Sequence, residues 1–374
     1  MSVGRQPAAT DAEGRATQEA DPTAFPKATG KQLLQAVFGL ALAAAILVFG
    51  LPWFGQTTWT EIGTHLDRLG WVNGLELFGL VVLGLWLYTF TLTGSLPGLG
   101  HVKALIVNVS GSAAGNLLPG GGAAGVAATY LMLRSWGFAR AAISTSVIVS
   151  GVWNVVARMA MPLLGVALLS STDALPKGVR RGAFTGGIVG LVIIAVFVAI
   201  LISPHKTERF GAWVHRRFGG RVSAWREQRG KSRVDLRHVL VDQRRRLATV
   251  TATGWFPMTV GVVGFLGVYF LLFWRTMEVV GVDLSLGKLF AAYAVGRLLT
   301  AVGVTPGGLG ITEAGTLAVM VAWGADKPAA AAGVLVFAIF THLLEVPLGA
   351  MGWLAWFVLP KVPLTPDGAP GARA

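Results

Sequence analysis

Four ionisable residues lie within long apolar stretches of the sequence: Arg158, Arg297, Glu313 and Glu345. On membrane-insertion scales, a charged side chain at the centre of an apolar span costs about 2.5 kcal/mol or more. The planar guanidinium of arginine donates paired hydrogen bonds to phosphate, and exposed amides at the start of a helix also bind anions. These residues predict a cationic centre that holds a lipid phosphate partway across a bilayer.

Each of these residues also has a purely structural interpretation. Glu313 could complement the positive end of a helix, which is worth about 0.3–1 kcal/mol. Arg158 and Glu345 could form a structural pair, and Arg297 could neutralise Glu313. His342, one turn before Glu345, is interpreted as a packed helix residue rather than a proton relay. Three asparagines are predicted to form hydrogen bonds between helices: Asn108, Asn116 and Asn154.

The sequence carries no motif for nucleotide, metal or acyl-transfer chemistry. It has no cysteine and six histidines, and it lacks the phosphate-binding loops, zinc spacings and nucleophile elbow that mark such sites. The Gly120–Gly122 run is not a phosphate loop, because no Lys-Ser or Lys-Thr pair follows it. We therefore expect no cofactor, no metal and no catalytic residue, and transport that is not driven by ATP bound to this chain.

The elements that must position these residues are predicted to be membrane helices. Apolar residues make up 53% of the chain and charged residues 13%, about half the charged share of soluble domains. A bilayer core of about 30 Å matches a helix of about 20 residues. The fold class is therefore all-α and polytopic. Six full spans are predicted, at 32–53, 72–97, 139–170, 179–202, 248–275 and 328–359.

Two further apolar stretches, 102–134 and 285–323, are each interrupted by a Pro-Gly cluster. Proline and glycine release backbone groups from a helix, and at membrane depth such groups must be buried in protein or line a wet cavity. We interpret both stretches as re-entrant hairpins; the alternative is two kinked helix pairs that cross the membrane fully. The cluster residues are predicted to line a substrate path: Pro119, Gly120, Gly121, Gly122, Pro306, Gly307, Gly308 and Gly310.

Charge is concentrated between residues 203 and 247, which hold thirteen Lys or Arg and four Asp or Glu of a chain whose net charge is +13. Because this loop lies between two apolar spans, it indicates a cytoplasmic loop rather than a nucleic-acid site. Counting the predicted membrane crossings from this loop toward each end of the chain places both termini in the cytoplasm. The predicted organisation is a tail (1–31), a first membrane half (32–202), the basic loop (203–247), a second membrane half (248–359) and a C-terminal tail (360–374).

The two interrupted stretches also match each other. Pro119 and Pro306 each lie 18 residues before the glycine of a Trp-Gly pair, at Gly137 and Gly324, and all four positions share one offset of 187. Three predicted full spans separate the two hairpins, so the hairpins would enter from opposite faces. This is the arrangement of inverted-repeat transporters, whose substrate sites lie between the repeats.

The segment Val304–Glu313, read with Leu117–Gly122, resembles the transmembrane region of lysylphosphatidylglycerol synthases, also called the flippase-like family. The resemblance extends over about residues 32–359. It implies inner-membrane helices with re-entrant segments that move a phospholipid between leaflets. Carried over by position, the implied functional residues are Arg297, Pro306–Gly310 and Glu313, together with Asn116 and Pro119–Gly122 in the first half.

The sequence departs from this family in two ways. The bifunctional synthases carry a soluble aminoacyltransferase domain after the membrane region, whereas 15 residues follow the last predicted span here. Lipid lysylation is therefore not expected. Ala123-Ala124-Gly125 also stands where many relatives have a charged residue, which leaves the head group open.

The predicted function is a flippase or transporter for an anionic polar lipid in the plasma membrane. The alternative is a membrane-embedded transferase or an accessory subunit of lipid or cell-envelope synthesis. Membrane lipids are the expected partners and nucleic acid is not. A second copy of the chain or an envelope-synthesis enzyme remains open as a protein partner.

Overall fold

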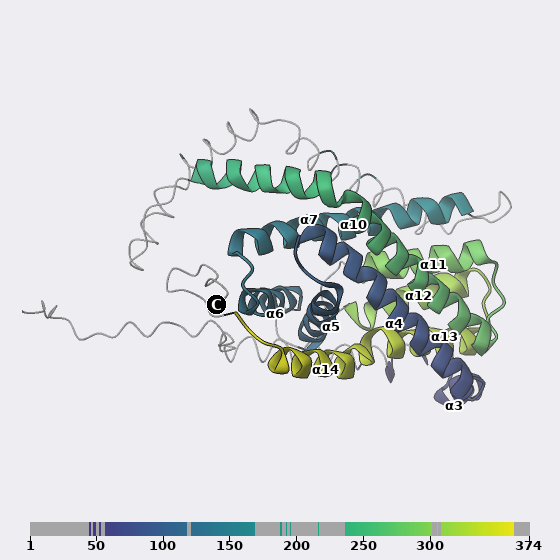
Figure 1. The fold of residues 1–374 in the computed structure, drawn as a ribbon. Coiled ribbons are helices and arrows are strands. Elements are labelled where there is room, and N and C mark those ends of the chain that lie inside the picture. Colours follow the sequence, from purple (N-terminus) through teal and green to yellow (C-terminus); the bar gives the residue numbers. More distant parts are fainter. Residues whose placement is uncertain are drawn as a thin grey trace, which may run out of the picture.

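The computed structural model describes residues 57–117, 121–168, 236–300 and 308–362, together with Thr305 and a few isolated positions near residues 45–53 and 188–216. Within these ranges the chain is helical, and no strand occurs (Figure 1). The tails, most of the basic loop and nearly all of the predicted spans 32–53 and 179–202 lie outside the described residues. So do Pro119, Gly120, Pro306 and Gly307.

Four described segments are long and apolar enough to cross a membrane. They are α4 (Gly70–Ser95), α7 (Arg140–Leu168), α10 (Leu236–Val280) and the run of α13 (Lys327–Ala338), η4 (Ile339–Leu343) and α14 (Glu345–Val358). They correspond to the predicted spans 72–97, 139–170, 248–275 and 328–359. The multi-pass helical class predicted from the sequence is confirmed.

A short helix, α3 (Trp59–Leu66), precedes the first of these segments. Thr58 caps it, and the carboxylate of Glu61 accepts a hydrogen bond from the Thr58 amide at 2.8 Å. The hydroxyl of Thr57 donates to the same carboxylate, and these hydrogen bonds lower the pKa of Glu61. The reciprocal cap fixes the start of α3, which packs against α13 and buries Ile62 in the core.

Each interrupted stretch forms a pair of short helices. The first pair is α5 (His101–Leu117, 17 residues) and α6 (Gly122–Ser135, 14 residues). The second is α11 (Leu286–Leu299, 14 residues) and α12 (Ile311–Ala322, 12 residues). At a rise of about 1.5 Å per residue, all four are shorter than a hydrocarbon core of about 30 Å.

Close contact between glycines holds the first pair together. A Cβ atom added to Gly125 of α6 would lie 2.8 Å from the carbonyl oxygen of Gly111 in α5. In the second pair, a Cβ atom on Gly296 of α11 would lie 2.5 Å from Oγ1 of Thr316 in α12. Small residues therefore set the separation of the helices, as is usual for helices packed in membranes.

The two pairs are packed reciprocally against the long segments. The α5 helix lies against α14, where Gly349 contacts Ala113 and Val109. The α11 helix lies against α7, where Gly165 contacts Ala291. Each pair is thus covered by the long segment that follows the other pair in the sequence.

The second helix of each pair ends in the same way. Trp136 and Trp323 follow α6 and α12, and the next residues, Gly137 and Gly324, have φ angles of 87° and 86°. Only glycine adopts such angles at little cost. The amide of the residue after each glycine bonds back to the helix, from Phe138 to Leu133 and from Ala325 to Met320.

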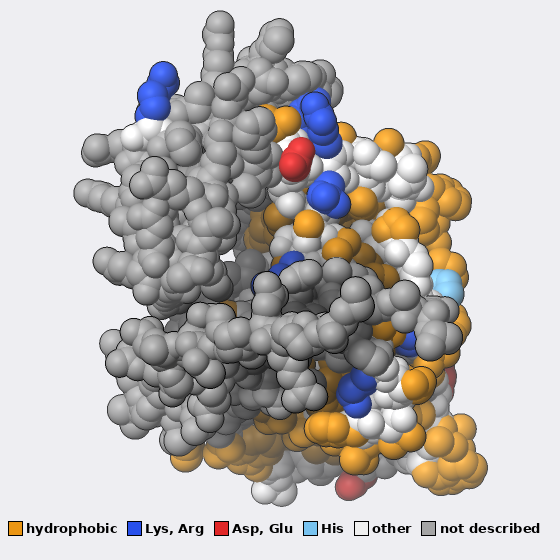
Figure 2. Space-filling model, turned by 60° about the vertical axis from the view of Figure 1, so that its left-hand side comes forward, with side chains coloured by type: hydrophobic (Ala, Val, Ile, Leu, Met, Phe, Trp, Pro, Cys, Tyr) orange, Lys and Arg blue, Asp and Glu red, His pale blue; other side chains and the backbone are white. Residues whose placement is uncertain are grey.

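Hydrophobic side chains cover much of the described part of the face in Figure 2, as a lipid-facing surface requires. Charges gather at the two ends of the bundle. At one end, the Nζ atoms of Lys103 and Lys361 lie 5.1 and 4.7 Å from the ring centroids of Trp136 and Trp356. At the other end, Arg275 Nε pairs with a carboxylate oxygen of Glu76 at 2.8 Å.

Candidate functional site

Arg297, in the last turn of α11, is buried inside the bundle with 6% of its surface exposed. Its guanidinium carbon lies 5.2 Å from the ring centroid of Tyr293, 5.3 Å from that of Phe337 and 5.8 Å from that of Tyr269. The Nη2 atom has no hydrogen-bond partner among the described residues. Aromatic faces therefore stabilise this charge, and part of its hydrogen-bonding capacity is unused.

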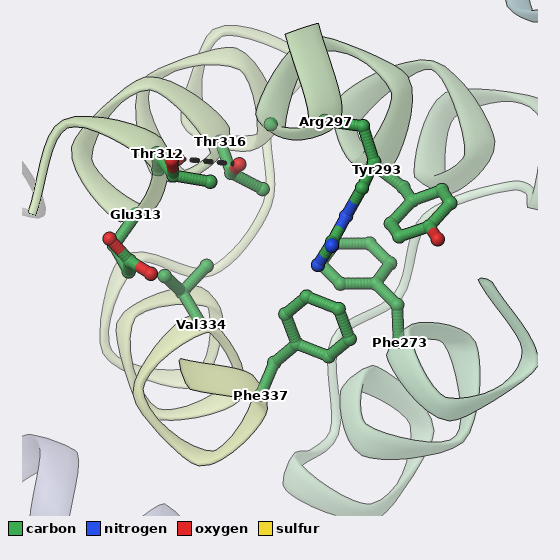
Figure 3. A pocket seen from close by; sticks show the side chains of 9 residues that line it. Phe273, Tyr293, Arg297, Thr312, Glu313, Thr316, Val334 and Phe337 are labelled. Atoms are coloured by element: carbon green, nitrogen blue, oxygen red, sulfur yellow. Dashed lines mark hydrogen bonds between the residues drawn. The ribbon is translucent and has the colours of Figure 1, made fainter. Parts of the chain in front are cut away.

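A pocket opens beside this guanidinium, between α10, α11, α12 and α13. Figure 3 shows Arg297 reaching into it between Phe273 and Phe337, with Glu313 on the opposite side. Its empty volume is about 260 Å³, including the part that is open to the outside. One buried cation and one buried anion therefore face the same cavity.

Glu313 is 3% exposed and caps the start of α12. Its Oε2 atom accepts a hydrogen bond of 2.6 Å from the amide of Gly310, where the φ angle is 84°. Its Oε1 atom lies 3.8 Å from Nδ1 of His342. The predicted role of Glu313 at the positive end of a helix is thus present in the structure.

His342 belongs to η4, a short π-helical stretch that separates α13 from α14. Such stretches are rare and occur often at functional sites, because they redirect the side chains that follow. Here His342 faces Glu313, and Glu345, three residues later, lies at the end of α5. The Nδ1 atom of His342 also lies 3.1 Å from the hydroxyl of Thr341.

Arg158 reaches the same region from α7. Its Nη1 atom donates a hydrogen bond of 2.8 Å to the hydroxyl of Thr300, which in turn donates to the backbone oxygen of Arg297 at 2.6 Å. The Nε atom of Arg158 is buried and has no partner in the described part of the chain. Thr300 therefore connects the two arginines, which are close enough to repel each other electrostatically.

Glu345 connects the first helix pair to this site through a hydrogen bond to α5. Its Oε2 atom accepts a hydrogen bond of 2.9 Å from the amide nitrogen of Asn116, in the last turn of α5. Arg297 and Arg158 both lie near enough to interact with the Glu345 charge. Residues from α5, α7, α11, α12 and α14 thus meet in one cluster of two arginines and two glutamates.

The structure brings together five of the predicted site residues: Asn116, Arg158, Arg297, Glu313 and Glu345. The described glycines of the two Pro-Gly clusters lie at the starts of helices. Gly121 and Gly122 lie at the start of α6, with a φ angle of 45° at Gly121, and Gly308 and Gly310 lie before and at the cap of α12. The backbone at Gly121, Gly308 and Gly310 has positive φ angles that other residues rarely adopt.

Two of the predicted pairings differ from what the structure contains. Among the described residues, no ion pair joins Arg297 to Glu313 or Arg158 to Glu345. Arg297 lies among aromatic rings, Arg158 is bonded to Thr300, and Glu345 is bonded to Asn116. Asn116 forms the predicted interhelical hydrogen bond, and Asn154 donates another, of 2.7 Å, to the hydroxyl of Tyr88 in α4.

Sequence reasoning missed the aromatic enclosure of Arg297 and the role of Thr300. One signal was available, because Tyr293 precedes Arg297 by four residues and the two therefore share a helix face. Tyr269 and Phe337 come from α10 and α13, and no local pattern joins them to Arg297. Their role depends on tertiary packing.

Comparison with known proteins gives one family. The family described as the lysylphosphatidylglycerol synthase TM region matches residues 18–349 of the chain. No curated protein sequence matches.

Proposed function

The chain belongs to the family of lysylphosphatidylglycerol synthase transmembrane regions, and on this premise we propose that it moves an anionic phospholipid between the leaflets of the plasma membrane. One observation carries the proposal. Two arginines from separate helices, the half-buried Arg158 and the buried Arg297, each keep a buried nitrogen donor without a partner among the described residues. Buried polar atoms normally have partners, so these donors are suited to a ligand.

The chemistry of the two side chains favours a phosphate. A guanidinium presents its donors in a planar fork that matches phosphate oxygens and cannot lose its charge at physiological pH. Both arginines belong to membrane helices, which points to a phosphate on a lipid. The lipid chains would remain against the apolar outer surface while the head group passes the cluster.

We further propose that the two helix pairs are re-entrant and form an inverted repeat. The reciprocal packing of α5 on α14 and of α11 on α7 supports this arrangement, as do the matching ends of α6 and α12. In inverted-repeat transporters, the substrate site lies between the repeats near the membrane midplane. The proposed role is transport without chemical change of the lipid, with both termini in the cytoplasm.

The test is lipid translocation by the purified protein in liposomes. Fluorescent short-chain phosphatidylglycerol is placed in one leaflet, and its loss from that leaflet is followed by chemical quenching. Arg158→Gln and Arg297→Gln are each expected to slow translocation by about tenfold or more, because a hydrogen bond to a charged group contributes about 1.5–3 kcal/mol. Phosphatidylcholine, which has no net charge, is measured in the same assay as the comparison lipid.

The matched control is Arg275→Gln. This arginine belongs to another of the long helices, α10, but it pairs with Glu76 and Glu278 at an end of the bundle, so translocation should keep the wild-type rate. Thermal unfolding in detergent verifies that each variant is folded. Wild-type rates in both Arg158→Gln and Arg297→Gln would refute the proposed site, and no translocation by the wild-type protein would refute the proposed function.

A further inference from the structure

With every side chain in its ordinary ionisation state, the formal charges of the two arginines and the two glutamates cancel. Arg158 and Arg297 contribute two positive charges, and Glu313 and Glu345 contribute two negative ones. Burial makes any uncompensated charge in such a group costly. The ligand-free cluster therefore carries no net formal charge.

An anionic phosphate that binds to the two arginines disturbs this balance by one negative charge. Arginine cannot supply the compensation, because it is already protonated. A proton taken up by a carboxylate, or by His342 beside Glu313, restores the balance as the phosphate arrives. The other titratable groups that face the cluster are Tyr88 of α4, Tyr269 of α10 and Tyr293 of α11.

The two carboxylates are not equally suited to this role. Glu313 accepts the amide hydrogen of Gly310 at the start of α12, and this position favours the negative form. Glu345 has a hydrogen bond from the side chain of Asn116. A carboxamide suits both states, because its nitrogen donates to a carboxylate and its oxygen accepts from a carboxylic acid.

We infer that translocation of the anionic lipid is coupled to a proton, and that Glu345 carries this proton. The inference rests on the proposed function. Glu345 lies where the start of α14 meets the end of α5, so its protonation changes a contact between the two halves of the chain. In the loaded site, the phosphate and the proton cancel each other's charge.

The experiment measures proton movement and lipid movement together. Liposomes contain the pH-sensitive dye pyranine, carry fluorescent phosphatidylglycerol in the outer leaflet and are subjected to an inward pH gradient. The wild-type protein is expected to bring in about one proton for each lipid moved, the number that restores neutrality. The gradient should also accelerate lipid movement in its own direction and slow it in the reverse direction.

Variants identify the group that carries the proton. Glu345→Gln is expected to lower the ratio of protons to lipids from about one to about zero, whereas Glu345→Asp should keep it. Glu313→Gln should also keep the ratio, even where its rate falls. Glu76→Gln, which removes an exposed carboxylate paired with Arg275, should leave both the ratio and the rate as in the wild type.

The outcomes separate the two proposals. Lipid movement by the wild type without proton movement, or a ratio unchanged in Glu345→Gln, would overturn the inference and leave the proposed function standing. A ratio lost in Glu313→Gln and kept in Glu345→Gln would overturn the choice of Glu345. No lipid movement by the wild type would overturn both.

Discussion

Asn116 donates a hydrogen bond of 2.9 Å to Glu345 across 229 residues of sequence. This bond connects the last turn of α5 to the first turn of α14, beside Arg158 and Arg297. It therefore joins the two halves of the chain at the place where the membrane-embedded charges meet. Its removal should affect both stability and transport.

Replacing Asn116 with Leu should destabilise the protein by about 1–2 kcal/mol, because the carboxylate of Glu345 loses its donor inside the bundle. Unfolding in mixed detergent measures the change. Asn73→Leu is the control, since Asn73 is exposed and its contact with Arg68 is 3.4 Å long. Equal effects of the two substitutions would contradict the structural role of the Asn116–Glu345 bond.

The stability that Tyr293 provides beside Arg297 should come more from its aromatic ring than from its hydroxyl. Tyr293→Phe loses only the hydrogen bond to the backbone oxygen of Leu266, at a cost of about 1 kcal/mol. Tyr293→Leu also loses a ring next to the cation, which should add about 2 kcal/mol. Unfolding measurements on the two variants test this order. The prediction fails if Tyr293→Leu is no less stable than Tyr293→Phe.

The reciprocal helix contacts predict that two distant glycines are sensitive to substitution, Gly349 more strongly than Gly165. Gly349→Leu would overlap Ala113 of α5, and Gly165→Leu would overlap Ala291 of α11. Overpacking of this kind costs about 1–3 kcal/mol or more.

Thermal unfolding and size-exclusion profiles measure these effects. Gly74→Ala in α4 is the control, because a Cβ atom there meets nothing within 4 Å. It should be neutral or stabilising by up to about 1 kcal/mol. Tolerance of leucine at either Gly349 or Gly165 would show that the helices do not approach as closely as the structure has them.

The absence of cysteine makes the proposed topology testable by single-cysteine labelling. A membrane-impermeant maleimide should label Lys103→Cys and Lys361→Cys only from the cytoplasmic side, and Arg68→Cys and Lys327→Cys only from the outer side. Gly122→Cys tests the depth of the first pair: a re-entrant turn leaves it unlabelled from both sides. Labelling of Gly122→Cys from the outer side would indicate a full crossing instead.

Local patterns predicted most of the described elements. Apolar length located the four spans that the structure describes, and the Pro-Gly clusters separated α5 from α6 and α11 from α12, because these residues interrupt helices. Charges within apolar runs identified Arg158, Arg297, Glu313 and Glu345, since such charges are rare in lipid.

The partners of those charges could not be predicted in the same way. Arg158 and Glu345 each lie 21 residues past the glycine of a Trp-Gly pair, and this matching position led to their prediction as a pair. The structure instead joins each of them to the end of a helix pair, Arg158 to Thr300 and Glu345 to Asn116. These partners depend on how the two halves pack, and neither composition nor spacing encodes that packing directly.

The reciprocal packing of α5 on α14 has a consequence for biosynthesis. The partner surface of α5 does not exist until the ribosome has added more than 200 further residues, which takes roughly 10–50 s at about 5–20 residues per second. During that interval the face of α5 that carries Val109, Ser110 and Ala113, together with the amide of Asn116, lacks its native covering. Insertion of the first half is therefore expected to produce an intermediate in which this face of α5 has no protein partner until α14 is made.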